Sequence, residues 1–382
     1  MSYAKKANKK VAVKKVIFFN NSDSQFHNHL LPLAIAAINK GYEVKVITTI
    51  SKYKQQIEKH NIPIIPLTIK RGSINPFTEL ILLLKIIWII QKEQPDILHN
   101  FTLKPILYGT IASLLCRTSK VINNFLGMGY LFINSNPIIK IIRFFYTKIL
   151  QISGKFKDIL YIAQNEDDRL LLSNLHVAKL DKIINQCSVG IDPKDFPDLQ
   201  RKNNKKVIFV LMARMLVDKG VNEFIAAAKV LYRKNLKAEF WLVGEPDKQN
   251  KASIDEETLK HHHNQGYVKY LGFQSDIEKI WQKADVAVLP SYREGLSRTL
   301  LEAGAYGMAI ITSNAPGGRE LVTEQKNGIL VPIKDAKALA KAMALLANNN
   351  DLRAKLAKNI RKYVLANYDA EQIAAKTIAL YE

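Results

Sequence analysis

The stretch of sequence that decides the fold reads LPSYREGLSRTLLEAGAYG, residues 289–307. A short apolar run ends at Pro290, a loop carries Glu294, and a helical pattern begins near Ser297. A strand, a loop and a helix in this order form the repeating unit of parallel α/β sheets. The segment therefore predicts a βα unit whose loop lies at the carboxyl edge of a sheet, where such folds bind ligands.

The same pattern recurs along the whole chain, because short apolar or β-branched runs alternate with helical periodicity. In the first half the expected strands are residues 16–19, 43–49, 62–67, 96–99, 121–125 and 159–163. In the second half they are residues 207–212, 240–243, 268–272, 286–290, 310–312 and 329–331. Each series suffices for one doubly wound sheet, so the predicted fold class is α/β, with two Rossmann-like domains facing a central cleft.

A proline-bearing and then charge-rich stretch, residues 192–206, separates the two series and is typical of a linker. We therefore expect one domain over residues 1–195 and a second over residues 206–365. Residues 366–382 are expected to form a C-terminal helix that is able to pack back on the first domain. The length of 382 residues fits two domains of ordinary size.

The net charge of +22 is concentrated in residues 1–190, which hold 26 Lys and Arg against 11 Asp and Glu. Residues 101–150 contain six basic residues, no acidic residue and many large apolar ones. Such a surface suits an anionic membrane face at least as well as nucleic acid. The longest apolar run, residues 80–90, is much shorter than the ~20 residues that cross a bilayer. We expect no transmembrane helix and place this run in the core.

Three further features limit the possible classes of protein. The Lys-rich residues 1–15 precede no long apolar run, so we expect neither a signal peptide nor a membrane anchor there. Cys116 and Cys187 form no CxxC pair, which favours a reducing, cytoplasmic compartment. Three consecutive histidines, residues 261–263, point in different directions and have no acidic or cysteine partner at ligand spacing. We therefore predict no metal site.

The helix that begins near Ser297 offers a site for a phosphate. Its first N–H groups, from Leu296 to Arg298, lack partners within the helix and lie at the positive end of the helix dipole. Glu302 can reach a neutral diol such as a ribose, and Glu294 at the loop tip can face a sugar. The alternative is that both glutamates are solvated charges at a helix end.

A second loop carries two cations. The expected strand 207–212 leads into Arg214 and Lys219, after which a helix begins at Val221. Arginine and lysine in one strand-to-helix loop can converge on a diphosphate and stabilise a departing nucleoside diphosphate. Alone, the pair is more typical of surface charges; together with the two glutamates it favours a nucleotide-sugar site.

Arg214 and Lys219, followed by Glu294, seven further residues and Glu302, resemble the donor signature of family-4 retaining glycosyltransferases with the GT-B fold. The resemblance implies that the two cations hold the diphosphate, that Glu302 binds the ribose and that Glu294 binds the donor sugar. It implies an acceptor-binding first domain, a nucleotide-sugar-binding second domain, and neither cofactor nor metal. Further donor-binding residues implied by the resemblance are Gly244, Phe273, Gly295, Leu296, Ser297 and Arg298.

Two stretches of the first half, PDILHNFTLKP at residues 95–105 and NNFLGMGYLF at residues 123–132, resemble a narrower subgroup. That subgroup extends undecaprenyl-diphosphate-linked sugars in capsule and N-glycan synthesis and includes N-acetylgalactosaminyltransferases that act on lipid-linked diacetylbacillosamine. The expected acceptor ligands are Lys104, Gly127, Tyr130 and Arg143, with Lys140 and Lys148 as further cations. Residues 137–150 predict a basic helix with an Ile/Phe face, which either meets the lipid or packs in the core with snorkelling lysines.

His99 and Glu294 are the catalytic candidates, although we do not assign a carboxylate nucleophile to Glu294. At the end of a strand His99 can contact the donor sugar or assist at the acceptor, whereas the alternative is a structural histidine. Many relatives have a second histidine two residues on, where this chain has Phe101.

The leading hypothesis is a cytoplasmic enzyme on the inner face of the cytoplasmic membrane. It would transfer a sugar, an N-acetylhexosamine, from a UDP-sugar to a polyprenyl-diphosphate-linked sugar, with retention implied by the resemblance. One alternative is a family-4 enzyme with a soluble acceptor. Another is a non-catalytic basic protein that binds nucleic acid, which leaves the donor residues unexplained and for which the chain carries no motif.

Overall fold

The computed structural model describes residues 13–70, 72, 75–128, 131–132, 136–188, 190–198, 206–247, 250 and 252–382. Contacts divide the chain into two compact units. The first consists of Met1–Asn124, Tyr146–Tyr161 and Ala374–Glu382. The second consists of Phe125–Phe145 and Ile162–Ile373. Residues 199–205 of the predicted linker lie outside the described residues, and the predicted domain boundaries stay predictions.

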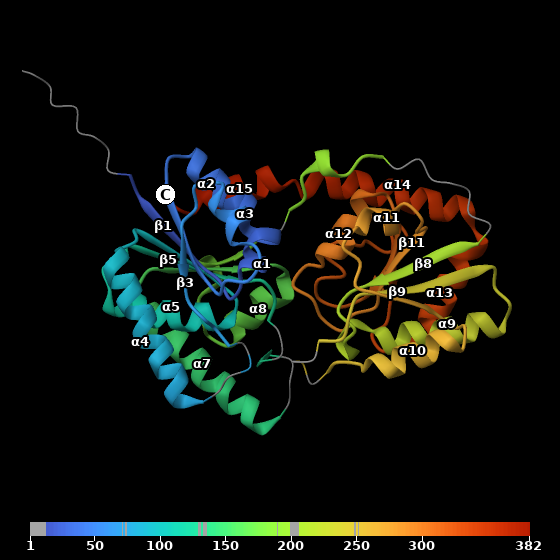
Figure 1. The fold of residues 1–382 in the computed structure, drawn as a ribbon, viewed down its shortest axis with the longest axis horizontal. Coiled ribbons are helices and arrows are strands. Elements are labelled where there is room, and N and C mark those ends of the chain that lie inside the picture. Colours follow the sequence, from blue (N-terminus) through green and yellow to red (C-terminus); the bar gives the residue numbers. More distant parts are fainter. Residues whose placement is uncertain are drawn as a thin grey trace, which may run out of the picture. The chain divides into compact units, whose positions relative to one another are not determined.

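Two sheets organise the described chain (Figure 1). The seven-stranded sheet has the order β3-β2-β1-β4-β5-β6-β7 and the six-stranded sheet the order β10-β9-β8-β11-β12-β13. In the first sheet β1 pairs in parallel with β2 on one side and β4 on the other. In the second sheet β8 pairs in parallel with β9 and β11 in the same way. The two neighbours of each central strand belong to opposite halves of the winding. This reversal is the switch point of a doubly wound fold, so the predicted α/β class with two Rossmann-like domains is confirmed.

The twelve expected strands are all present, with ends that differ from the prediction by at most two residues. The strands of the first sheet are β1 (Lys15–Phe19), β2 (Glu43–Thr48), β3 (Ile64–Pro66), β4 (Ile97–Phe101), β5 (Lys120–Phe125), β6 (Ile159–Ala163) and β7 (Ile183–Asn185). Those of the second are β8 (Val207–Met212), β9 (Ala238–Val243), β10 (Lys269–Gly272), β11 (Val286–Leu289), β12 (Ala309–Ser313) and β13 (Ile329–Val331). Strand β7 was not predicted, because its apolar run consists of only two residues, Ile183 and Ile184, and polar residues follow at once.

Helices connect the strands and cover the sheets. In the first part of the chain they are α1 (Asp23–Gln25), the π-helical turn η1 (Phe26–Leu30), α2 (Leu31–Asn39), α3 (Lys54–Glu58), α4 (Pro76–Glu93), α5 (Leu103–Leu115), α7 (Pro137–Phe156) and α8 (Glu166–Asn174). Short 3₁₀ turns follow at η2 (Leu180–Lys182), η3 (Pro193–Asp195) and η4 (Val217–Lys219). The remaining helices are α9 (Val221–Arg233), α10 (Glu256–Asn264), α11 (Ile277–Trp281), α12 (Arg298–Ala305), α13 (Ala336–Asn348), α14 (Asn350–Asn367) and α15 (Ala370–Ala379).

Side-chain alternation along the central strand of the second sheet produces a core on each face. Phe209 and Leu211 point into a cluster that includes residues of α9 and α13, whereas Ile208 and Val210 point into a cluster that includes residues of α12 and α14. Figure 1 shows α9 and α10 on one face of this sheet and α11, α12 and α14 on the other. Both faces are covered, so the carboxyl edge of the sheet is left to carry the loops.

Helix α4 corrects one expectation. Residues 80–90 were expected to be core, but only one side of the helix is buried against the first sheet. The buried side consists of Leu82, Ile86, Ile89 and Ile90. Large side chains that are more than half exposed follow the other side, at Phe77, Leu80, Ile81, Leu84 and Trp88. The prediction was wrong for Leu80, Ile81, Leu84 and Trp88, because a helix that is apolar all round does not reveal from sequence which side packs.

Helix α7 likewise presents a large apolar surface. Its side chains that are more than half exposed are Ile138, Ile141, Phe144, Phe145, Ile152 and Phe156. Its buried residues are Tyr146, Thr147, Leu150 and Ser153. Of the two alternatives for this helix, the structure therefore favours a surface helix over a buried one. No helix among the described residues is long and apolar enough to cross a membrane.

The C-terminal residues complete the core of the first unit. The Tyr381 hydroxyl shares a 2.8 Å hydrogen bond with His99 Nδ1, and both side chains are buried. The His99 ring also stacks against the rings of Phe18 and Phe101. Nearby, Lys120 Nζ donates to the Leu380 carbonyl at 3.0 Å. Burial lowers the pKa of His99 from 6.5 to about 3, so this ring is neutral at ordinary pH.

This burial makes a prediction about stability and pH. Below pH 6.5 His99 becomes protonated in the unfolded chain, whereas in the folded chain it stays neutral down to about pH 3. The free energy of unfolding should therefore fall as the pH drops through that window, by up to ~1.4 kcal/mol per pH unit. Replacing both partners, in His99→Leu/Tyr381→Phe, should remove this part of the dependence when urea unfolding is measured at pH 7 and pH 4.5.

The control is His261→Gln, on the exposed surface of α10, which should keep the wild-type difference between the two pH values. An unchanged difference in the His99→Leu/Tyr381→Phe variant would contradict the assignment of His99 as a buried neutral residue.

Candidate functional site

The donor loop, residues 290–297, lies where the sequence predicts it. It follows β11 and ends at α12, whose N-cap is Ser297. The Ser297 Oγ accepts a hydrogen bond from the Leu300 N–H at 3.3 Å, which satisfies one of the first N–H groups of α12 and stabilises the start of the helix. The positive end of the α12 dipole is thus directed at this loop. An anion placed there would be stabilised by it.

The two predicted donor segments meet at one ion pair. Lys219 Nζ lies 2.5 Å from a carboxylate oxygen of Glu294, and both side chains are mostly buried. Lys219 ends the turn η4, and the following Gly220 has φ +74°. A Cβ at Gly220 would lie 2.3 Å from the Pro290 carbonyl oxygen, so only glycine allows the two loops to approach this closely. The Tyr292 N–H, which donates to the Asp218 carbonyl at 2.9 Å, joins the same loops.

Arg214 is held differently. Its guanidinium is 55% exposed and lies 2.6 Å from the carboxylate of Asp247. The neighbouring Gly244 has φ +129°, and a Cβ there would lie 1.9 Å from the Ala213 carbonyl oxygen. The Gly244 N–H in turn donates to the Gly272 carbonyl at 2.8 Å. The loops after β8, β9 and β10 are therefore stacked by their backbones.

Glu302 forms the third pair of the site. One of its carboxylate oxygens accepts from Arg298 Nε at 2.7 Å, one helical turn away on α12. Phe273, which follows β10, is 64% exposed. The structure thus brings Lys219 together with Glu294 and Arg298 together with Glu302. All of these residues belong to the second unit, and their roles toward a ligand stay predictions.

Residues that were not predicted also hold the donor loop. Asn165, the N-cap of α8, donates from Nδ2 to the carbonyls of Glu294 and Gly295, at 3.3 and 3.1 Å. Asp168 is completely buried and forms an ion pair with Arg293. Burial raises the pKa of the Asp168 carboxyl, and the Arg293 charge opposes that rise. Only the helix-start pattern of residues 165–168 was visible in sequence, and it carries no information about the loop.

The acceptor candidates have local partners. Lys104 Nζ lies 2.7 Å from Glu79 and also 2.7 Å from the Lys70 carbonyl, all within the first unit. Arg143 donates from Nη1 to the Phe132 carbonyl at 2.9 Å. Gly127 has φ +142° and lies against the backbone of Gly295. Tyr130 lies outside the described residues.

His99 has a purely local environment within the first unit. It is fully buried in the first unit and bonded to Tyr381, which favours its structural alternative over a role at the substrate. Its Nε2 atom has no hydrogen-bond partner in the part of the chain that is described. The three histidines at 261–263 lie along α10, and no group of three possible metal ligands occurs among the described residues.

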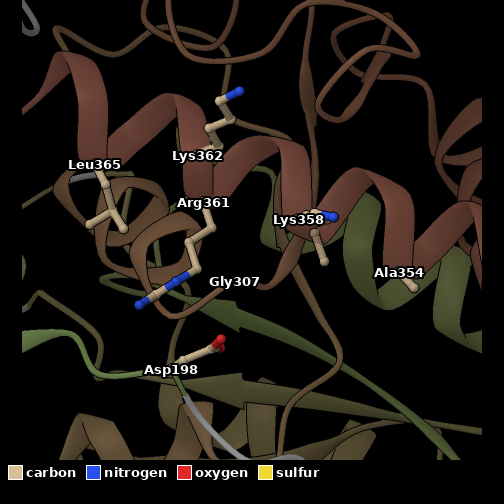
Figure 2. A pocket seen from close by; sticks show the side chains of 8 residues that line it. Asp198, Gly307, Ala354, Lys358, Arg361, Lys362 and Leu365 are labelled. Atoms are coloured by element: carbon tan, nitrogen blue, oxygen red, sulfur yellow. The ribbon is translucent and has the colours of Figure 1, made fainter.

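A hollow of about 460 Å³ lies along α14. Figure 2 shows Lys358, Arg361 and Lys362 on that helix and Asp198 on the segment beside it. Arg361 is engaged with backbone, because its guanidinium donates to the Ala305 and Phe196 carbonyls. This hollow contains none of the predicted donor-site residues.

Comparison with known proteins gives matches along the whole chain. The family model "Glycosyl transferases group 1" matches residues 193–363, and the model "Glycosyl transferase 4-like" matches residues 15–165. The chain is 30% identical over 380 residues to the N,N'-diacetylbacillosaminyl-diphospho-undecaprenol alpha-1,3-N-acetylgalactosaminyltransferase of Campylobacter jejuni. That match covers 96% of this chain and 98% of the relative.

Two further matches are informative. The UDP-Gal:alpha-D-GlcNAc-diphosphoundecaprenol alpha-1,3-galactosyltransferase of Escherichia coli is 25% identical over 305 residues, which cover 77% of this chain and 76% of the relative. Among solved structures, Anabaena HepE in complex with UDP matches with a TM-score of 0.75 and 18% identity, covering 96% of this chain and 99% of that one. At this identity the structural likeness concerns the fold.

The close packing of the donor loop makes a prediction. A Cβ at Gly295 would lie 2.5 Å from the Leu126 carbonyl oxygen and 3.1 Å from the Gly127 Cα, and backbone cannot move aside as a side chain can. Gly295→Ala should therefore destabilise the protein by about 1–3 kcal/mol in urea unfolding. The control is Gly154→Ala in α7, where a Cβ meets nothing within 4 Å and helix propensity favours alanine. Equal stability of both variants would contradict this packing.

Proposed function

The chain belongs to the group 1 glycosyltransferases, and on that basis we propose that it transfers an N-acetylhexosamine from a UDP-sugar to an undecaprenyl-diphosphate-linked sugar. The resemblance to this family seen in the sequence is thereby confirmed. The observation that carries the proposal is the convergence of Lys219 and Glu294, from two separate loops, beside the N-terminus of α12. The substrates named for the Campylobacter jejuni and Escherichia coli relatives support the lipid-linked acceptor.

In the proposed complex different residues bind the diphosphate, the ribose and the sugar of the donor. Arg214 and Lys219 bind the diphosphate, aided by the positive end of α12. Glu302 accepts hydrogen bonds from the ribose hydroxyls and Glu294 from the hydroxyls of the sugar. Lysine has three N–H donors, so Lys219 can keep its contact with Glu294 and still donate to a phosphate oxygen.

The reaction then needs stabilisation of a leaving diphosphate. The bond from the anomeric carbon to the phosphate oxygen breaks, and the acceptor hydroxyl bonds to the same carbon on the same face. The proton of that hydroxyl passes to the leaving phosphate oxygen, so the products are the extended lipid-linked glycan and UDP. Arg214, Lys219 and the α12 dipole stabilise the negative charge that develops on the leaving group. We propose that this charge suffices without a metal ion or cofactor.

The proposal includes work at the inner face of the cytoplasmic membrane. Helices α4 and α7 both expose rows of large apolar side chains, and α7 also carries Lys140, Arg143 and Lys148. Apolar and basic residues together favour binding to an anionic lipid surface, where a polyprenyl-linked acceptor resides. A soluble acceptor, the same-fold alternative, leaves these two apolar surfaces without a role. A non-catalytic nucleic-acid-binding protein does not fit the family to which the chain belongs.

The donor assignment is tested by turnover. Purified protein with UDP-N-acetylhexosamines and an undecaprenyl-diphosphate-linked sugar should release UDP. Lys219→Ala and Glu302→Ala should each lower the rate by about 100-fold, because a charge contact to the leaving group and the ribose contact are lost. Activity should be unchanged in EDTA. The matched controls are Lys341→Ala and Glu257→Ala, two exposed helix positions outside the site, and full activity of the two site variants would refute the assignment.

Membrane association is tested separately by flotation. The protein should float with vesicles that contain phosphatidylglycerol and much less with phosphatidylcholine alone, because the attraction to anionic lipid adds to apolar burial. Leu84→Glu/Trp88→Glu should reduce flotation about tenfold or more by placing charge in the apolar row of α4. Leu345→Glu, on the exposed side of α13, is the control and should float as wild type does. Equal flotation of all variants would exclude α4 as the lipid-facing surface.

A further inference from the structure

The backbone of the donor loop is held by side chains from the start of α8. Asn165 is fully buried, and its Nδ2 donates to the carbonyls of both Glu294 and Gly295. Its Oδ1 accepts the Asp168 N–H at 2.7 Å, which caps α8 and fixes the orientation of the amide. One side chain thus ends a helix and binds two successive carbonyls of the loop that carries the predicted sugar ligand.

The residue before Glu294 is held by a buried charge. Arg293 forms an ion pair with Asp168, whose side chain has no exposed surface. Asn165 Nδ2 also lies 3.2 Å from an Asp168 carboxylate oxygen, so the two residues support each other. A carboxylate removed from water in this way is stable as an anion only while its partners remain in place. The pairing therefore constrains the position of Arg293 strongly.

The adjacent acid provides a contrast. Asp167 pairs with Arg319, at 2.8 Å to each carboxylate oxygen, but both side chains are more than one third exposed. Exposed pairs of this kind contribute little because water competes for them. Two neighbouring aspartates therefore meet two arginines, and only the Asp168 pair is buried beside the donor loop.

We propose that Asp168 and Asn165 are positioning residues for the donor sugar. Together they fix the backbone on either side of the Glu294 Cα, so that its carboxylate can meet Lys219 and the sugar at the same time. The inference rests on the proposed role of Glu294. It adds that this role depends on Asn165 and Asp168, through their contacts with the loop.

The inference separates two parts of the donor. Glu294 is directed at the sugar, whereas Glu302, Arg214 and Lys219 bind the nucleotide. A loop displaced at Arg293 and Glu294, while Ser297 still caps α12, should therefore reduce turnover of the UDP-sugar and leave the affinity for UDP itself unchanged. A substitution that only destabilises the fold would weaken both.

The test compares Asp168→Asn with the matched control Asp167→Asn. Asp168→Asn should lower kcat about 10- to 100-fold, because small misplacements of a positioning group have effects of this size. The dissociation constant of UDP, measured by calorimetry, should change by less than about twofold in both variants. The Asp167→Asn variant should retain the wild-type kcat.

A double variant makes the test specific. If Asp168 acts through Glu294, then Asp168→Asn/Glu294→Gln should be no slower than Glu294→Gln alone. The inference would be overturned if the double variant lost activity by the product of the two single effects. A loss of UDP affinity in Asp168→Asn would overturn it as well. Should Asp168→Asn fail to fold, Arg293→Lys keeps the charge but loses the planar fork, and the same comparison applies.

Amide hydrogen exchange keeps this inference distinct from the proposed function. Peptides that cover the donor loop should exchange faster in Asp168→Asn than in wild type, and at the wild-type rate in Asp167→Asn. Unchanged exchange in Asp168→Asn would overturn the positioning role whatever the activity of the enzyme. If the wild type released no UDP from any UDP-sugar while exchange changed as expected, the proposed function would fail and the anchoring of the loop would stand.

Discussion

Backbone packed directly against backbone holds the donor loop, and the positions of the predicted donor ligands Lys219, Glu294 and Gly295 depend on it. Gly220 meets the Pro290 carbonyl, Gly295 meets the Leu126 carbonyl and Gly317, at φ +85°, meets the backbone of Glu294. A Cβ at any of these three positions would lie within 2.6 Å of an existing atom. Because such contacts leave no room for adjustment, they fix the Glu294 Cα more tightly than side-chain packing alone would. A fixed Cα also limits the positions that the Glu294 carboxylate can occupy.

The parts of this arrangement that could be predicted are local in sequence. A buried strand, a loop and a capped helix can be recognised from residues 286–305 alone, and the spacing of Arg214, Lys219, Glu294 and Glu302 carries the family resemblance. All strands of the two sheets except β7 could be predicted for the same reason, since each is an apolar run between helical patterns. The order of strands and helices and the segments of the donor site can therefore be recognised from neighbouring residues alone.

The parts that could not be predicted depend on partners distant in the chain. Arg293 and Asp168 are separated by 125 positions, and neither residue indicates the other. His99 was predicted to be the last residue of a strand, and it does lie in a strand, β4, which continues to Phe101. The side chain, however, faces a core that is completed by Tyr381, 282 positions later. Alternation along a strand shows which residues share a face but not what covers that face.

Two ion pairs of the site differ in the free energy needed to separate them. Arg214 and Asp247 are largely exposed on the arginine side, and such a pair contributes about 0–1 kcal/mol, so water or a phosphate can replace the carboxylate easily. Lys219 and Glu294 are sheltered, and parting them would leave two charges poorly solvated. An incoming diphosphate therefore needs less free energy to displace Asp247 from Arg214 than to separate Lys219 from Glu294. It can bind Lys219 while Lys219 keeps its contact with Glu294. On this physical argument the exposed arginine supplies the adjustable contact, while the sheltered lysine links the phosphate to the glutamate that is directed at the sugar.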